Sequence, residues 1–237
     1  MNESLKGPLS MYSLTVIVPA YNESKTIENS LEKLLALDFL SQILVVNDGS
    51  YDDTLKIITN FENLDNRVKV FSNNKNQGKG YSLNSIRQFI NSDYVVIHDA
   101  DLEYDPSDLK PMFQLVNGEN MILGTRFRGN KIRKNIYKRT NIANKVMSKF
   151  FSIVHKTNIS DIAVCYKMMP ASFFKTTEFK ENGFSIEIEM VAKFLKLSSQ
   201  INEVPISYYG RSYSEGKKIK SIDGLFYLLN TLKYKFF

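Results

Sequence analysis

Three carboxylates follow a short apolar stretch near the middle of the chain. Residues 94–97 (Tyr-Val-Val-Ile) have the composition of a buried parallel strand, and Asp99, Asp101 and Glu103 come directly after it. Alternate residues of an extended chain point the same way, so these side chains could converge on one point. Oxygen ligands at the carboxyl end of a strand suit Mg²⁺ or Mn²⁺, which usually also takes oxygens from a substrate diphosphate. An isolated Asp-x-Asp is more often a solvated acidic turn, so the rest of the chain must decide.

The first half of the chain alternates short apolar stretches with segments of helical spacing. The stretches expected to be strands lie at residues 14–18, 43–46, 68–71, 94–97 and 121–124. Between them apolar residues recur every three or four positions, as in Ile27, Leu31 and Leu34. This alternation predicts an α/β fold with a mostly parallel central sheet, right-handed crossovers and helices on both faces.

Polar clusters stand at the carboxyl end of four of these predicted elements. They occupy residues 19–23, 47–50, 78–80 and 99–103. Ligands of open parallel sheets bind beyond the carboxyl ends of the strands, so four loops point to one rim. The second half is expected to form helices over 136–154 and 186–197, strands over 165–169 and 204–209, and a basic loop over 211–220 before a final helix.

Composition and charge restrict the possible classes of protein. A hydrophobic content of 43% and a single cysteine favour a folded protein of a reducing compartment, without an internal disulfide. We expect no signal peptide in the polar first residues and no membrane span, because no apolar run reaches about 20 residues. The expectation is a cytoplasmic protein, soluble or peripheral to the membrane.

Basic residues are concentrated in the second half of the chain. Residues 1–120 carry 10 Lys or Arg and 17 Asp or Glu, whereas residues 121–237 carry 21 and 8. Such a field favours nucleic acid, anionic lipid or phosphorylated substrates. A nucleic-acid-binding module would leave the carboxylates of residues 99–103 unexplained, and a nucleotidyltransferase would need a glycine-rich loop where residues 19–23 stand. We therefore expect no nucleic-acid partner.

With these motifs in place, the chain resembles family 2 glycosyltransferases of the GT-A fold. Within them it is most similar to the dolichyl-phosphate mannose or polyprenyl-phosphate sugar synthases. The resemblance covers roughly residues 14–224. The matching stretches are residues 16–23 (VIVPAYNE), 45–50 (VVNDGS), 76–80 (NQGKG), 99–106 (DADLEYDP), 124–127 (GTRF), 203–206 (EVPI), Arg211 and 215–218 (EGKK). One departure is Asn47, where the family commonly has aspartate.

The resemblance implies a role for each group of site residues. A nucleotide-sugar pocket would be formed by Pro19, Tyr21, Glu23, Asp48, Gly78, Lys79 and Asp99. Asp99, Asp101 and Glu103 would hold Mg²⁺ or Mn²⁺. Donor and acceptor phosphates would meet Arg126, Arg211, Lys217 and Lys218. Asp101, Arg126 and Arg211 would be the catalytic residues.

It also implies one catalytic domain over residues 1–237. Residues 1–125 would bind a GDP- or UDP-linked sugar, residues 126–224 would face the acceptor, and residues 225–237 would form an apolar helix. This helix either lies on a membrane surface or docks on the core; both alternatives fit its composition. His98, His155 and Cys165 are expected to be structural.

The resulting functional hypothesis is inverting transfer of a hexose from a nucleotide diphosphate to a polyprenyl phosphate. The alternative is a family 2 enzyme acting on a sugar hydroxyl in cell-surface glycan synthesis. A hydroxyl needs a general base, whereas a phosphate monoester is already anionic near neutral pH. Asp161 either is such a base or orients an arginine or lysine.

Overall fold

The computed structural model describes residues 11–198, 200–211 and 221–236, and in its first half the predicted alternation is confirmed. The elements are β1 (Leu14–Ala20), α1 (Ile27–Leu35), β2 (Gln42–Asn47), α2 (Thr54–Leu64), β3 (Val68–Ser72), α3 (Lys79–Ser85), β4 (Tyr94–Ile97), α4 (Leu109–Phe113) and β5 (Met121–Thr125). Short 3₁₀ turns at Arg87–Phe89 and Pro106–Asp108 precede β4 and α4.

The second half matches its predicted pattern less closely. Its elements are β6 (Arg133–Lys134), α5 (Lys138–His155), β7 (Lys167–Pro170), α6 (Ala171–Thr176), α7 (Ile186–Leu197), β8 (Ile201–Pro205), β9 (Tyr208–Tyr209) and α8 (Ser221–Phe236). The single strand expected over 204–209 is two strands, because β8 ends at Pro205 and the chain then pairs with β6 in a separate small sheet. None of the helices among the described residues has the length and hydropathy required to cross a bilayer.

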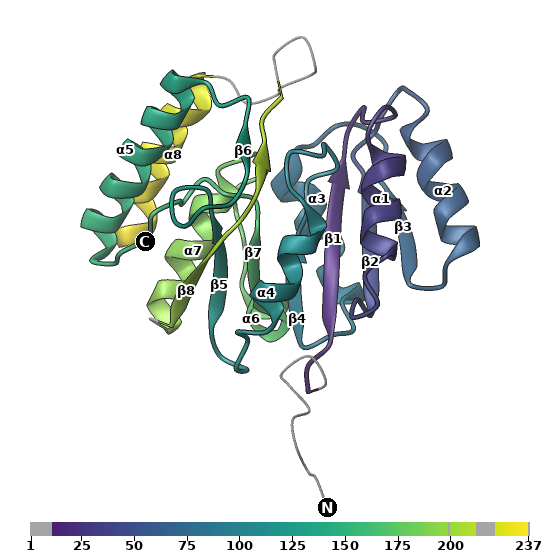
Figure 1. The fold of residues 1–237 in the computed structure, drawn as a ribbon, viewed down its shortest axis with the longest axis horizontal. Coiled ribbons are helices and arrows are strands. Elements are labelled where there is room, and N and C mark those ends of the chain that lie inside the picture. Colours follow the sequence, from purple (N-terminus) through teal and green to yellow (C-terminus); the bar gives the residue numbers. More distant parts are fainter. Residues whose placement is uncertain (1–10, 199, 212–220, 237) are drawn as a thin grey trace, which may run out of the picture.

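The central sheet has seven strands in the order β3-β2-β1-β4-β7-β5-β8. Its neighbours are parallel except at β7, which runs antiparallel to both β4 and β5. Helices lie in front of and behind the sheet, and α5 and α8 lie side by side at one end of the molecule (Figure 1). All of β4 is buried, as expected for a strand covered on both faces.

Apolar residues of the sheet and the covering helices form one buried cluster that runs from β1 to α8. The predicted single domain is compatible with this continuous core. Along the sheet, the parallel unit β3-β2-β1-β4 is followed by the mixed unit β7-β5-β8, in which β5 comes from the first 125 residues.

Two glycines at the start of α3 allow a distant segment to approach the helix. Gly78 has φ +97°, and a Cβ on Gly80 would stand 1.9 Å from the carbonyl oxygen of Glu181. The Gly80 N–H donates to the carbonyl of Asn182 at 2.7 Å. Glycine at position 80 is therefore explained by packing of the chain against residues 181–183.

We expect Gly80→Ala to lower the free energy of unfolding by about 1 to 3 kcal/mol, because the added methyl group would overlap backbone atoms that cannot rotate away. Gly183→Ala is the matched control, since a Cβ there meets nothing within 4 Å. It should change stability by less than about 1 kcal/mol. Urea denaturation of both variants measures the difference. Equal effects would contradict the close packing at Gly80.

Candidate active site

The loops that carry the predicted site residues meet at one rim of the sheet. β1 pairs in parallel with both β2 and β4, so the carboxyl ends of these three strands are neighbours. Glu23 follows β1, Asp48 follows β2, and Asp99 follows β4. The convergence expected from the sequence is thus present in the structure.

Arg211 connects two of these loops from the far end of the chain. Its guanidinium lies 2.8 Å from the Oδ2 of Asp101 and 3.1 Å from the Oε2 of Glu23. The backbone N–H of Arg211 donates to the Oε1 of Glu103 at 2.8 Å, and the hydroxyl of Tyr208 donates to the Oε2 of Glu103 at 2.8 Å. Residues separated by most of the chain therefore form one charged cluster.

Asp101 lies in an environment with an excess of negative charge. Burial, together with the charges of Asp99 and Glu103, raises the pKa of its carboxyl group from 3.8 to about 7, even though Arg211 acts in the opposite direction. Burial and the neighbouring negative charges both disfavour the ionised form of this carboxyl group. A further cation beside it would stabilise the ionised form.

Asp99 belongs to a different set of contacts. Its Oδ1 lies 2.7 Å from the ammonium of Lys79, which also lies 2.7 Å from the Oε1 of Glu187. Glu187 in turn contacts Lys167 at 2.6 Å. Burial acts to raise the pKa of Asp99, but the charge of Lys79 outweighs it and the pKa is lowered. Lys79 is buried in this chain of alternating charges, so its principal contacts are carboxylates.

The structure does not bring the three predicted metal ligands together. Among the described residues no group of three acidic, histidine or cysteine side chains is arranged to hold a metal ion. The predicted convergence assumed an extended chain beyond β4. Leu102 instead has φ +61°, in the left-handed region, so the backbone turns and the alternation of side chains ends there.

Asp48 fixes the loop that precedes α3. Its Oδ2 accepts from the Gly78 N–H at 2.8 Å, and its Oδ1 accepts from the Gln77 N–H at 3.0 Å and from Asn73 at 2.8 Å. Asp48 does not cap the following helix α2, whose N-cap residue is Asp53. Farther along the rim, Pro19 is the penultimate residue of β1. Just after this strand, the ring of Tyr21 contacts the ring of Tyr51 edge to face.

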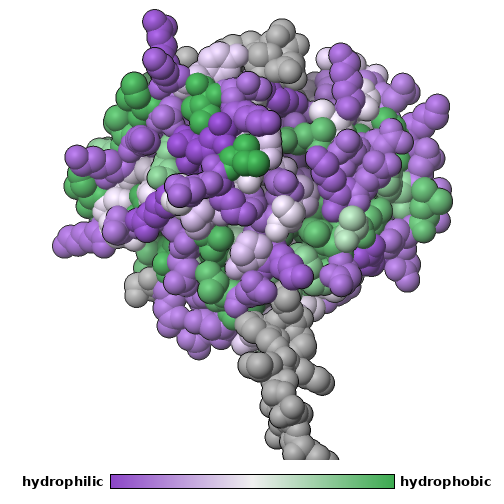
Figure 2. All heavy atoms as spheres, in the orientation of Figure 1, coloured by the Kyte–Doolittle hydropathy of each residue, from purple (hydrophilic) through white to green (hydrophobic). Residues whose placement is uncertain are grey.

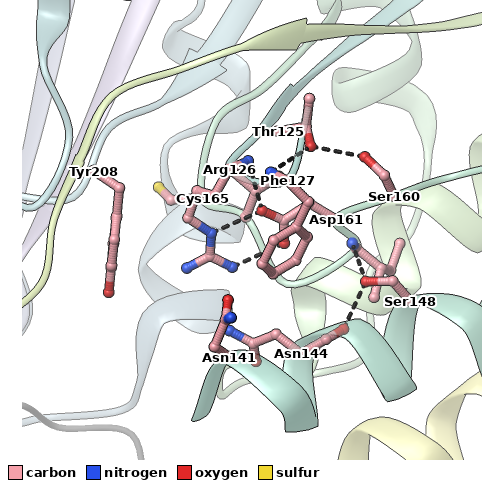
Figure 3. Close-up of polar contacts among 12 residues, drawn as sticks. Thr125, Arg126, Phe127, Asn141, Asn144, Ser148, Ser160, Asp161, Cys165 and Tyr208 are labelled. Carbon is pink, nitrogen blue, oxygen red and sulfur yellow. Dashed lines mark hydrogen bonds and ion pairs between the residues drawn. The ribbon is translucent and has the colours of Figure 1, made fainter. Parts of the chain in front are cut away.

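Arg126 and Asp161 form a buried two-point ion pair (Figure 3). The Nε of Arg126 donates to Oδ2 at 2.7 Å and its Nη2 donates to Oδ1 at 2.8 Å. The Arg126 backbone N–H also donates to Oδ2, at 3.0 Å. Asp161 is fully buried, so of the two roles left open for it the structure favours orientation of an arginine. Burial acts to lower the pKa of the Arg126 guanidinium, but the charge of Asp161 outweighs it and raises this pKa well above its usual range.

A small hollow lies beside this pair, between β6, β9 and the start of α5. Its lining among the described residues contains two arginines and no carboxylate: Arg126, Phe127, Arg133, Asn135, Ile136, Tyr137, Thr140, Asn141, Asn144 and Tyr208. Arg133 donates to Asn141 at 2.9 Å, while its Nε is buried without a hydrogen-bond partner in the described part of the chain. Figure 3 shows Asn141 and Asn144 on α5 below the Arg126 guanidinium. We call this hollow the Arg126 pocket.

Sequence reasoning missed Arg133, Asn141 and Asn144. The available signal was the pair of asparagines one helical turn apart, directly after a basic loop. Lys217 and Lys218, which were expected to bind phosphate, lie outside the described residues. Lys131 is exposed and pairs with the buried Asp108 at 2.7 Å.

Comparison with protein-family models identifies the class. The model described as Glycosyl transferase family 2 matches residues 15–177, and the chain belongs to this family. Among solved structures it is similar to glucosyl-3-phosphoglycerate synthase of Mycobacterium tuberculosis, with a TM-score of 0.73 and 15% identity over 96% of this chain and 81% of that one. That similarity confirms the GT-A fold. The neighbour was solved in complex with Mn²⁺, UDP and glucosyl-3-phosphoglycerate.

Three curated relatives illustrate the range of the family. The glycosyltransferase AglD of Haloferax volcanii is 22% identical over 90% of this chain, and the dolichyl-phosphate β-glucosyltransferase ALG5C of Trichomonas vaginalis is 31% identical over 51% of it. The chain spans only 35% and 40% of the length of these two proteins. An uncharacterized protein of Methanocaldococcus jannaschii is 26% identical, with 88% of this chain and 95% of that protein covered.

Asp161→Asn should lower the free energy of unfolding by about 3 to 5 kcal/mol, because it leaves the buried Arg126 without its counter-charge. Asp65→Asn, which breaks a partly exposed pair with Arg67, should cost about 1 kcal/mol or less. Chemical denaturation of the two variants provides the comparison. Similar small losses in both would show that the Arg126–Asp161 pair does not depend on burial.

Asp101 should make the protein less stable as pH rises. Between pH about 4 and about 7 the folded state retains a proton on Asp101 that the unfolded chain has lost, so the stability associated with this group decreases over that range. Asp101→Asn removes the titration. Relative to the original protein, the variant should gain on the order of 4 kcal/mol between pH 4 and pH 8, because each unit of the pKa difference corresponds to about 1.4 kcal/mol. A stability difference that stays constant over this range would contradict the raised pKa.

Proposed function

We propose that this protein transfers a hexose from a GDP- or UDP-linked donor to a polyprenyl, dolichyl-type phosphate, with inversion at the anomeric carbon. The reaction requires Mg²⁺ or Mn²⁺ and takes place at the cytoplasmic face of a membrane, to which the protein binds peripherally.

The observation that carries this proposal is the Arg126 pocket. Asp161 holds the planar guanidinium of Arg126 through two parallel hydrogen bonds, and Arg133 lies across the same hollow with its Nε unpartnered. Two oriented arginines and two side-chain amides suit the oxygens of a phosphate monoester. A sugar hydroxyl offers no charge that would compensate this concentration of cations.

The acceptor side of the mechanism follows from these contacts. A phosphate monoester is anionic near pH 7, so its oxygen needs orientation and no removal of a proton. Arg126 and Arg133 would hold two of its oxygens while a third attacks the anomeric carbon. The bond from that carbon to the donor diphosphate breaks, and the nucleoside diphosphate leaves with the electron pair.

The donor would bind at the rim formed by the loops after β1, β2 and β4. Pro19, Tyr21 and Asp48 would contact the nucleoside, with Glu23 beside them. Gly78 and Lys79 would act less directly, since Gly78 shapes the loop that Asp48 holds and Lys79 positions Asp99.

Among the described residues the rim carboxylates do not form a complete metal site, so a divalent cation would also need ligands from the donor. Asp101 would hold it, with Asp99 and Glu103 nearby, and oxygens of the donor would complete the ligand set. Two observations indicate that the rim attracts positive charge. The pKa of Asp101 is raised, and the guanidinium of Arg211 lies between Asp101 and Glu23. A bound Mg²⁺ or Mn²⁺ would neutralise charge that develops on the leaving diphosphate. The complexes of the solved neighbour with Mn²⁺ and UDP are consistent with this assignment.

A phosphorylated soluble acceptor is the main rival. The solved neighbour has been crystallised with phosphoglyceric acid, and its acceptor also carries a phosphate. The match to ALG5C, a dolichyl-phosphate glucosyltransferase, favours the lipid phosphate, whereas the hexosyltransferase Agl6 of Haloferax volcanii supports glycan biosynthesis more generally. A sugar-hydroxyl acceptor would need a general base, and Asp161, the candidate for it, is occupied by Arg126.

A transfer assay decides between these acceptors. Purified protein would be incubated with GDP- or UDP-hexoses, Mn²⁺ and one of three acceptors: a short-chain polyprenyl phosphate, the corresponding polyprenol, or phosphoglyceric acid. We expect transfer to the polyprenyl phosphate alone, and its loss in excess chelator. Transfer to phosphoglyceric acid or to the polyprenol, or no transfer to the polyprenyl phosphate, would overturn the proposal.

In the same assay Arg133→Gln should raise the KM for the lipid phosphate about tenfold or more and leave the KM for the donor unchanged, because it removes one charged contact to phosphate. Arg87→Gln makes the same change of charge near the amino end of β4, outside the Arg126 pocket, and should leave both constants within about twofold. Equal behaviour of the two variants would exclude Arg133 from the acceptor site.

A further inference from the structure

Helix α8 is apolar on two opposite faces. Its inner face, with Tyr227, Thr231 and Tyr234, is buried against the domain, and the carbonyl of Thr231 lies 3.0 Å from His155 of α5. The helix therefore docks on the core, one of the two alternatives expected from its sequence. Its outer face nevertheless exposes an apolar row at helical spacing, consisting of Leu225, Leu229, Leu232 and Phe236 with Phe226 beside it.

Helix α5, the neighbour of α8, exposes a second apolar row. Ile142, Val146 and Ile153 are all more than half exposed. Basic residues accompany them on the solvent side of the helix: Lys138, Arg139, Lys145, Lys149 and Lys156. In Figure 2 hydrophobic and hydrophilic side chains are interspersed at the upper left, over the region where Figure 1 draws these two helices. We call the outer sides of α5 and α8 the α5–α8 face.

The charge of this surface restricts what can cover it. Of the ten Lys or Arg among residues 121–160, five belong to α5 and its C-cap residue Lys156, and this stretch contains no Asp or Glu. A second copy of the same face would bring these cations against each other, which opposes self-association through it. Exposed leucine, isoleucine and phenylalanine bordered by lysines are the combination that binds an anionic bilayer, because apolar side chains enter the interface while the ammonium groups meet lipid phosphates.

The position of the face relative to the Arg126 pocket agrees with this occupant. Asn141 and Asn144 of α5 line the pocket, whereas Ile142 and Val146, in the same turns of the helix, are exposed. One helix thus borders the phosphate-binding hollow with one side and carries the apolar row on another.

We infer that the α5–α8 face docks on the surface of an anionic membrane. Leu225, Leu229, Leu232 and Phe236 of α8, with Ile142, Val146 and Ile153 of α5, insert at the level of the head groups. This docking places the Arg126 pocket at the depth of lipid phosphates. The inference rests on the proposed function, which includes peripheral binding to a membrane, and it names the surface that makes the contact.

Co-sedimentation with vesicles tests the inference on the full chain. The protein should bind vesicles of phosphatidylcholine mixed with phosphatidylglycerol, bind much less to phosphatidylcholine alone, and release as NaCl is increased. Leu229→Gln should weaken binding about tenfold and Lys149→Glu at least about fivefold, because each removes one apolar or one basic contact.

Matched controls come from α2, on the other half of the molecule. Leu64→Gln and Lys56→Glu change equally exposed residue types and should leave vesicle binding within about twofold. Transfer to a short-chain acceptor without vesicles should be unchanged in all four variants, which separates this inference from the proposed function. Absence of binding to anionic vesicles, or equal loss in the α8 and α2 variants, would overturn it. So would a stable dimer that Leu229→Gln dissociates, because the occupant would then be a second copy.

Discussion

Several buried acidic side chains at the centre of this protein are paired with cations from other parts of the chain. Lys79 meets Asp99, Arg211 meets Asp101 and Glu23, and Arg126 meets Asp161. Carboxylates gathered at the rim of a parallel sheet repel one another and lose hydration on burial, so such a rim is stable only with paired charges. The pairs of Arg211 with Asp101 and Glu23 also join the second half of the chain to the first.

The balance is incomplete at Asp101. Its carboxyl group retains a raised pKa despite the contact with Arg211, because Asp99 and Glu103 add further negative charge nearby. A site that binds a donor diphosphate through a cation needs negative charge that the protein's own cations do not neutralise. The rim around Asp101 therefore has an excess of negative charge, whereas the lining of the Arg126 pocket contains two arginines and, among the described residues, no carboxylate.

Helix α5 connects the chemistry with the outer surface. Its first turns complete the Arg126 pocket, its middle packs through Ser148 and Phe151, and its exposed side carries alternating lysines and aliphatic residues. Helix α8 covers its flank and exposes a similar apolar row. Helix α5 therefore contributes both to the lining of the Arg126 pocket and to the exposed surface of aliphatic and basic residues.

The sequence by itself determined the parallel half of the fold and the family, because each strand there is an apolar run that ends in its own polar loop. It also indicated Asp101, Arg126 and Arg211 as residues of the rim. Three features required the tertiary structure. The positive φ of Leu102 separates the carboxylates that an extended chain would have aligned. Lys79 and Asp161 are buried and form ion pairs with residues that are distant in the sequence, so the residues next to them in the chain do not predict these pairs. Arg133 and Asn141 come together only because β6 and α5 fold over Arg126, and contacts between separate elements leave no periodic pattern in a single sequence.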